Sequence, residues 1–100
     1  TKVSNPEEFG VVEVVDNKIK SIQEKPTNPK SDYIAVGLYL FDNLCFEYIK
    51  SIQKSGRGEY EITSLIEKYL NNHSLNYQFT KGWWVDAGTP EAIKTIEKLL

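Results

Sequence analysis

The sequence contains too few cysteine and histidine residues for several common kinds of site. Cys45 is the only cysteine and His73 the only histidine among the 100 residues. One thiol cannot form an internal disulfide framework, and one thiol with one imidazole cannot build a zinc cage. A site for a hard cation such as Mg²⁺, made from carboxylate oxygens, stays open.

Long apolar runs and an excess of one charge are also missing. No stretch approaches the roughly 18 apolar residues that a membrane-spanning helix needs, and the opening TKVSNPEEFG lacks the apolar centre of a signal peptide. Twelve basic residues face 14 acidic ones, with neither sign in a block. This balance argues against nucleic acid or an anionic membrane as a partner. We therefore expect no nucleic-acid partner, no membrane partner and a cytoplasmic location.

Strand patterns come first along the chain. The segments FGVVEVV (9–15) and KIKSIQE (18–24) flank Asp16 and Asn17, which tolerate left-handed backbone, and so predict a tight β-hairpin. The segment YIAVGLYLF (33–41) is apolar without polar alternation. It predicts a strand buried on both faces inside a sheet larger than the hairpin.

Helix patterns dominate the rest of the chain, with short strands expected at 75–80 and 83–86. The first helix should have Asp42 as its N-cap and end near Lys54. The second should cover 62–72, and the third should begin at Thr89 with Pro90 in its first turn. The residues that these helices should bury recur at helical spacing: Leu44, Tyr48, Ile49, Ile52, Ile62, Leu65, Ile66, Tyr69, Leu70, Ile93, Ile96 and Leu100.

The segment GWWVDAGTP (82–90) is the first candidate for function. Asp86 ends a predicted strand and faces the beginning of a helix, and ligands of α/β sheets bind at such edges. Alternatively, Trp83 and Trp84 only pack, and Asp86 only accepts hydrogen bonds from the backbone of the turn.

Three other short segments carry candidate binding groups. In EKP (24–26), Glu24 can accept hydrogen bonds from hydroxyls and Lys25 can bind a phosphate, provided that the chain twists at Pro26 so that both side chains act together. A solvated Glu-Lys pair is the alternative. In FGVVE (9–13), Gly10 leaves space above its own amide, although a strand-edge bulge would explain it equally well.

The third of these segments is GRGEYEIT (56–63). Two glycines flank Arg57, so that the planar guanidinium can approach a phosphate closely. The alternative is a flexible loop in which Glu59 and Glu61 only add negative charge to the first turn of a helix.

Taken in order, the segments FGVVEVVDNKIKSIQEKP, NPKSDYIAVGLYLFDN, GRGEYEIT and GWWVDAGTPEAI resemble the second half of the sugar-phosphate nucleotidyltransferases over nearly the whole chain. The resemblance implies an α/β class, as part of a Rossmann-like mixed-sheet fold with a hairpin, further strands and three helices. It also implies an enzyme that joins a nucleoside triphosphate to a sugar 1-phosphate and releases pyrophosphate, with Mg²⁺ neutralising charge. Glucose 1-phosphate with dTTP or UTP is the expected pair, and N-acetylglucosamine or mannose 1-phosphate stays open.

The resemblance also implies roles for individual residues. The Gly10 amide and Glu24 would bind sugar hydroxyls, and Lys25 and Arg57 would bind the phosphate of the sugar 1-phosphate. Asp86 would be one of two aspartates that hold the metal. The catalytic set implied in this way is Lys25, Arg57 and Asp86. Further sugar-pocket residues implied by the resemblance are Val36, Gly37 and Trp84.

Parts of the family pattern do not occur in these residues. The family binds its nucleotide with a stretch of the type GGxGTRL, and that stretch and the second metal-binding aspartate are absent here. We therefore interpret residues 1–100 as a partial domain, the sugar-phosphate half, which needs an N-terminal nucleotide-binding half and is inactive alone. Homo-oligomers are common in the family, and an oligomer stays open. Two alternatives are a non-catalytic sugar-phosphate-binding module that works with a separate chain, and a structural domain without a ligand.

Overall fold

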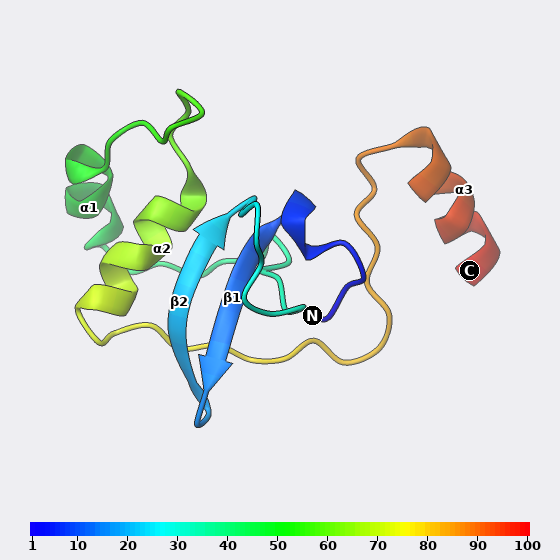
Figure 1. The fold of residues 1–100 in the computed structure, drawn as a ribbon, viewed down its shortest axis with the longest axis horizontal. Helices are drawn as coiled ribbons and strands as arrows, with labels where there is room; N and C mark the ends of the chain where they lie inside the picture. Colours follow the sequence, from blue (N-terminus) through cyan, green and yellow to red (C-terminus); the bar gives the residue numbers. More distant parts are fainter.

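A computed structural model describes all 100 residues, Thr1 to Leu100. The chain forms a mixed α/β structure, as predicted, with a two-stranded antiparallel sheet in the centre, one helix against the sheet, a second helix packed on the first, and a third helix at the far end (Figure 1). No helix is long and apolar enough to cross a membrane. The elements follow in the order η1 (Pro6–Glu8), β1 (Gly10–Val15), β2 (Lys18–Glu24), α1 (Cys45–Ser51), α2 (Ile62–Asn71) and α3 (Pro90–Leu99).

The predicted hairpin is confirmed. Strands β1 and β2 pair antiparallel, with Val12 opposite Ile22. Asp16 and Asn17 have φ values of 50° and 60°. Left-handed backbone at both central residues gives a turn whose twist matches that of the two strands. The register shifts after Glu13, where an irregularity bends the ladder.

The core is small and lies where α2 packs on the hairpin. Val12, Ile22 and Ile66 form its centre. Leu65 and Tyr69 are also buried, as the spacing along the second predicted helix required. Only nine of the 100 residues are buried, so that each core side chain carries a large share of the stability.

Helix α1 is shorter than predicted. It covers Cys45–Ser51 rather than beginning directly after Asp42 and reaching Lys54. Asp42 is engaged in the preceding turn, because its Oδ1 accepts hydrogen bonds from the Leu44 amide at 3.0 Å and from the Tyr69 hydroxyl at 2.8 Å. The Asp42 carboxylate therefore connects the turn before α1 to Tyr69 of α2.

The predicted strand at 33–41 is wrong for most of its length. Tyr33 and Ile34 bridge to Lys2 and Val11, but the chain after them is in no strand. Leu38 and Leu40 are 87% and 102% exposed. A strand needs a neighbour for its backbone groups, and after the Ala35 amide, which donates to the Gly10 carbonyl, no other segment pairs with 36–41.

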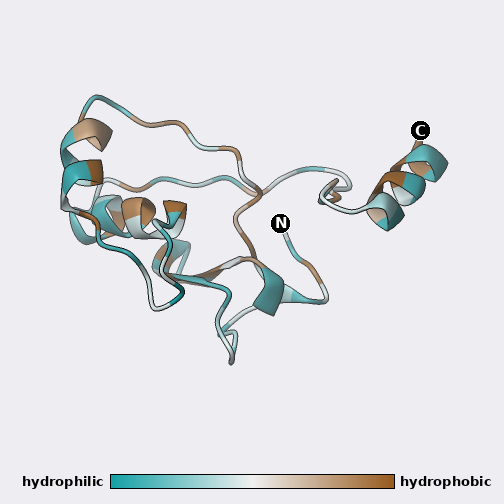
Figure 2. Ribbon diagram, turned by 90° about the horizontal axis from the view of Figure 1, so that it is seen from above, coloured by the Kyte–Doolittle hydropathy of each residue, from teal (hydrophilic) through white to brown (hydrophobic).

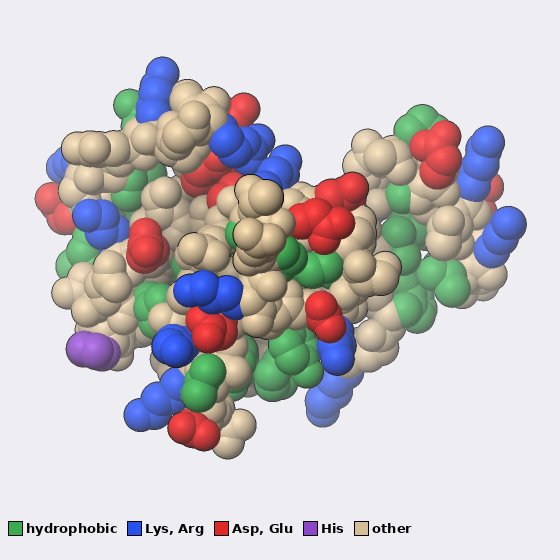
Figure 3. Space-filling model, in the orientation of Figure 1, with side chains coloured by type: hydrophobic (Ala, Val, Ile, Leu, Met, Phe, Trp, Pro, Cys, Tyr) green, Lys and Arg blue, Asp and Glu red, His purple; other side chains and the backbone are tan.

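Predicted strands also lack partners in the C-terminal third of the chain. The segments 75–80 and 83–86, predicted as strands, have no ladder partner and are extended loop. Helix α3 begins as predicted, since Thr89 Oγ1 accepts a hydrogen bond from the Ala92 amide at 3.1 Å. Its apolar face is not buried, and the helix stands apart from the core in both views (Figures 1 and 2). Figure 3 shows apolar side chains open to solvent at that end.

Replacing Leu65 by alanine tests the position of the core. Leu65 is 4% exposed, and a buried leucine truncated to alanine costs about 2–5 kcal/mol. We expect Leu65→Ala to lower the urea midpoint strongly or to unfold the chain. Leu40→Ala removes the same atoms from a fully exposed site and should leave the midpoint unchanged. Equal losses in the two variants would contradict the core described here.

Tyr69 makes stability depend on alkaline pH. Burial and its hydrogen bond to Asp42 raise the pKa of Tyr69 to about 12. The folded state therefore favours the neutral phenol, and this stabilisation is complete below the unfolded pKa of about 10 and is lost as the pH rises to about 12. We expect Tyr69→Phe to have a lower Tm near neutral pH and a smaller loss of Tm in that window. Tyr48→Phe is the control, since the Tyr48 hydroxyl makes no hydrogen bond. The idea fails if Tyr69→Phe follows the wild-type alkaline profile.

Candidate functional site

The first group of predicted site residues meets where β1 begins and β2 ends. Gly10 lies opposite Glu24 in the ladder. The Lys25 amide donates a hydrogen bond to the Phe9 carbonyl at 2.9 Å. Lys25 has a φ of 40°, in the left-handed region that non-glycine residues seldom adopt. The chain therefore does twist just before Pro26, as joint action of Glu24 and Lys25 requires.

Gly10 is closely surrounded. A Cβ at this position would lie 3.0 Å from Thr63 Cγ2 and 3.4 Å from Glu24 Oε2. Thr63 is 5% exposed and belongs to the first turn of α2. The absence of a side chain at Gly10 thus lets α2 approach the end of the hairpin.

Arg57 lies beside this end of the hairpin, within reach of three carboxylates. Its Nη1 is 4.0 Å from Glu24 Oε1 and 3.5 Å from Glu61 Oε1, and its Nη2 is 3.5 Å from Glu59 Oε2. The positive φ of 78° at Gly58 turns the loop back after Arg57. Glu24 and Arg57, more than 30 residues apart in sequence, therefore form one charged cluster with a hydrogen-bond acceptor next to a cation.

The predicted sugar-pocket pair Val36-Gly37 lies in the unpaired segment after Ile34. Val36 is half-buried, and Gly37 is exposed with a φ of 81°. Two residues on, burial and the negative charge of Glu24 raise the pKa of Tyr39, while the Gly37 backbone opposes that rise. Tyr39 thus belongs to the Glu24 neighbourhood, although the sequence interpretation passed over it. Its spacing of two residues from Gly37 in a strand-like pattern was the available signal.

Trp84 and Asp86 form a second group. The rings of Trp84 and Phe9 meet edge to face, with centroids 5.7 Å apart and planes at 79°. Asp86 is exposed, accepts no hydrogen bond and forms no ion pair. The turn at 86–89 is therefore not held by this carboxylate. Both residues line a hollow of about 420 Å³ whose other lining residues are Lys2, Val3, Ser4, Asn5, Glu8, Phe9, Val85 and Thr89.

Phe9 is the residue that both groups contact. Its carbonyl binds the Lys25 amide, and its ring packs on Trp84. No hydrogen bond or ion pair joins Asp86 to Lys25 or Arg57. The structure therefore brings Gly10, Glu24 and Arg57 together with the backbone of Lys25, and Phe9 lies between this group and the Asp86 hollow.

A magnesium ion could take one ligand from this chain. Asp86 offers a carboxylate with free lone pairs, but no group of three or more His, Cys, Asp or Glu side chains is placed so that it could hold a metal ion. Magnesium is commonly held by one or two carboxylates together with substrate phosphates and water. Asp86 fits such a site as a single ligand, and another carboxylate would have to complete it.

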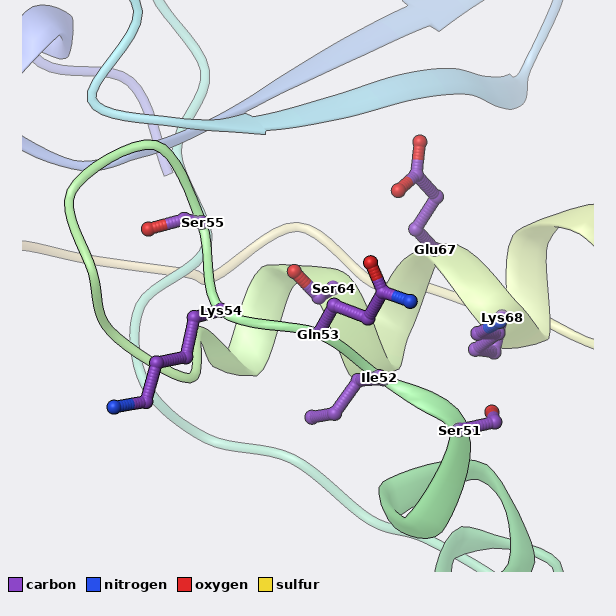
Figure 4. A pocket seen from close by; sticks show the side chains of 8 residues that line it. All are labelled: Ser51, Ile52, Gln53, Lys54, Ser55, Ser64, Glu67 and Lys68. Atoms are coloured by element: carbon purple, nitrogen blue, oxygen red, sulfur yellow. The ribbon is translucent and has the colours of Figure 1, made fainter.

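A second hollow lies away from these residues. It measures about 370 Å³ and is formed by the chain at 51–55 and the side of α2 (Figure 4). Ser51, Ser55, Ser64 and Glu67 give it a polar wall. It contains none of the predicted site residues.

Comparison with known proteins identifies the family and agrees with the fold. The model of the nucleotidyl transferase family matches residues 1–100, and the chain belongs to that family. It is 46% identical to the glucose-1-phosphate thymidylyltransferase of Neisseria meningitidis, over 92% of this chain and 33% of the relative. It is 42% identical to the bifunctional protein GlmU of Methanocaldococcus jannaschii, over 99% of this chain and 24% of the relative. Within the family, this chain is thus similar to the glucose-1-phosphate thymidylyltransferases.

A solved structure gives the same result for the fold. A Bacillus anthracis protein assigned as a glucose-1-phosphate thymidylyltransferase, solved in complex with sucrose, matches with a TM-score of 0.87 and 44% identity. The match covers 98% of this chain and 40% of that protein. The chain spans about a third of the length of the curated thymidylyltransferases that it matches.

The close approach at Gly10 can be tested with a second glycine as control. In Gly10→Ala the new methyl group must push Thr63 or Glu24 aside, and overpacking of this kind costs about 1–3 kcal/mol. Gly56→Ala adds the same methyl group where no atom lies within 4 Å and φ is not positive. Urea unfolding should show a loss for Gly10→Ala and little change, or a slight gain, for Gly56→Ala. A Gly10→Ala chain as stable as the wild type would contradict the approach of α2.

Proposed function

We propose that residues 1–100 form the sugar-phosphate-binding half of a nucleotidyltransferase that joins glucose 1-phosphate to dTTP or UTP. The observation that carries this proposal is the placement of Arg57 against Glu24, with Lys25 next in the chain. A guanidinium suits a phosphate, and a carboxylate suits sugar hydroxyls. A sugar 1-phosphate presents both groups on one small molecule.

The backbone at Gly10 supports a role in binding the sugar. The Gly10 carbonyl accepts a hydrogen bond from the Ala35 amide, on the side of β1 away from β2. Since the amide and carbonyl of one strand residue point to the same side, the Gly10 amide also points away from β2. We propose that it donates to a sugar hydroxyl while Glu24 accepts from others. Val36, Gly37 and Trp84 would line the same pocket.

The proposed reaction is a phosphoryl-type transfer. An oxygen of the sugar phosphate attacks the α-phosphorus of the nucleoside triphosphate, a new P–O bond forms, and the bond to pyrophosphate breaks. Lys25 and Arg57 would hold the attacking phosphate in position and offset its negative charge. Asp86 would supply one ligand to Mg²⁺, which neutralises charge on the phosphates when bound.

The remaining parts of the reaction are assigned to residues outside this chain. The triphosphate needs a nucleotide-binding half, for which the GGxGTRL type of stretch is the expected signature, and a second metal-binding aspartate. We therefore propose that residues 1–100 alone have no transferase activity. Both substrates are dissolved phosphate compounds of the cell interior, so that a cytoplasmic location fits the proposal. Pairing with the nucleotide-binding half, and homo-oligomerisation, belong to the same hypothesis.

Titration calorimetry with glucose 1-phosphate, with and without Mg²⁺, tests the proposal. We expect saturable binding that Arg57→Ala weakens about tenfold or more, since a hydrogen bond to a charged group contributes about 1.5–3 kcal/mol. Lys50→Ala removes a positive charge from the exposed side of α1 and should bind as the wild type does. Asp86→Asn should abolish any gain from Mg²⁺.

Two results would change the assignment. No heat from a chain that circular dichroism shows to be folded would rule out a preformed sugar-phosphate site in these residues. Binding that is retained while addition of the nucleotide-binding half gives no nucleotide sugar would favour the non-catalytic binding module instead.

A further inference from the structure

The two terminal nitrogens of Arg57 face carboxylates that differ in their exposure to solvent. Nη1 faces Glu24 and Glu61, whose side chains are 20% and 11% exposed. Nη2 faces only Glu59, which is 62% exposed, and donates a long hydrogen bond of 3.5 Å to its Oε2. An ion pair in solvent contributes little, because water screens it and both side chains lose freedom. A ligand can therefore replace Glu59 as the partner of Nη2 more easily than it can replace the partners of Nη1.

Ser55 connects Glu61 to the backbone of Arg57. The Ser55 hydroxyl donates a hydrogen bond to Glu61 Oε1 at 3.0 Å, the oxygen that also faces Arg57 Nη1. The same hydroxyl accepts a hydrogen bond from the Arg57 amide at 3.2 Å. The Ser55 carbonyl in turn accepts one from the Gly58 amide at 2.8 Å. Ser55 and Glu61 thus hold Arg57 at its main chain and at its side chain.

Glu61 is well placed to orient another residue because it is fixed itself. It immediately precedes α2, which packs on the hairpin that carries Glu24. A residue at the start of a packed helix moves less than one in the middle of a loop. Arg57, in contrast, lies on a glycine-flanked loop with 41% of its side chain exposed. Without an anchor, its long side chain would sample many rotamers.

We propose that Glu61, acting with Ser55, is a positioning residue that fixes Arg57 Nη1 next to Glu24 and leaves Nη2 for an incoming phosphate. The phosphate then displaces the exposed Glu59, while Glu61 stays in place. Orienting the side chain before binding reduces the entropy lost on binding. The part of this inference that concerns the phosphate rests on the proposed function. The orientation of Arg57 in the ligand-free chain is independent of the proposed function.

The ligand-free orientation can be measured directly because Arg57 is the only arginine of the chain. Its side-chain Nε–H gives a single ¹⁵N–¹H signal. We expect Glu61→Gln and Ser55→Ala to move that signal towards the position of free arginine and to speed its exchange with water, because the guanidinium loses its anchor at Nη1 and becomes more mobile and more exposed. Ser55→Thr keeps the hydroxyl and should retain the wild-type signal. Glu59→Gln is the matched control, and it should change the signal little.

Backbone amide signals of α2 separate a loss of orientation from a loss of fold. Beyond the first turn they should stay unchanged in Glu61→Gln, since Glu61 is the N-cap of the helix and its carbonyl, not its side chain, accepts the hydrogen bond from the Ser64 amide. An Arg57 signal that is unaffected by Glu61→Gln in a folded chain would overturn the proposal. So would a Glu59→Gln variant that shifts the signal as much as Glu61→Gln does.

Titration with glucose 1-phosphate then tests the consequence for binding. Glu61→Gln should weaken binding about three- to tenfold, whereas Glu59→Gln should leave it unchanged or strengthen it, because a competing carboxylate is removed. In an Arg57→Ala background, Glu61→Gln should have no further effect. An equal effect in both backgrounds would show that Glu61 does not act through Arg57. If the wild-type chain binds no glucose 1-phosphate, the proposed function fails, while the Arg57 signal still decides the role of Glu61.

Discussion

The packing of α2 on the hairpin sets the geometry of the whole charged cluster. Ile66 of α2 lies against Val12 and Ile22, so that the helix is fixed relative to both strands. Glu24 ends β2, and Glu61 immediately precedes α2. The distance between these two carboxylates, and hence the position of Arg57 between them, follows from an apolar contact that contains no functional group. Gly10 completes this arrangement, since its missing side chain lets Thr63 of the same helix come close.

The charges in this cluster favour a particular kind of ligand. The Arg57 guanidinium stands among three carboxylates, Glu24, Glu59 and Glu61, and Lys25 follows Glu24 in the chain. An inorganic anion would gain from the cations but would be repelled by every carboxylate. A sugar phosphate can place hydroxyl donors against the carboxylates and its anionic group against the cations. Such a site is selective because one ligand must pair with the positive groups and also donate hydrogen bonds to the carboxylates.

Local sequence patterns correctly predicted the elements whose conformation depends only on residues close in the chain. Asp16 and Asn17 specify the hairpin turn, and Thr89 with Pro90 specifies the start of α3. The apolar spacing in 62–70 specified the buried face of α2. The segment 33–41 differs, because its apolar pattern is suited to ladder partners on both sides that these 100 residues do not contain. The predicted strand was therefore wrong after Ala35, because only the residues from Tyr33 to Ala35 find backbone partners.

The candidate site was predictable in part. The motifs pointed to Glu24 and Arg57, and the structure places them together. The contributions of Tyr39, Thr63 and Glu61 could not be seen, because they depend on how the hairpin, the extended segment and α2 meet in space. The separation of Asp86 from Lys25 and Arg57 was equally hidden, since no local pattern determines how far a C-terminal turn lies from a central hairpin.

The left-handed backbone at Lys25 restricts which sequences this site can evolve through. A φ of 40° is tolerated by glycine and asparagine but is costly for β-branched residues. Glycine and asparagine would relieve the backbone and would also remove the positive charge. Most substitutions of Lys25 would therefore either strain the backbone or remove the positive charge. Val36 and Trp84, whose φ angles are not positive, carry no comparable limit on substitution.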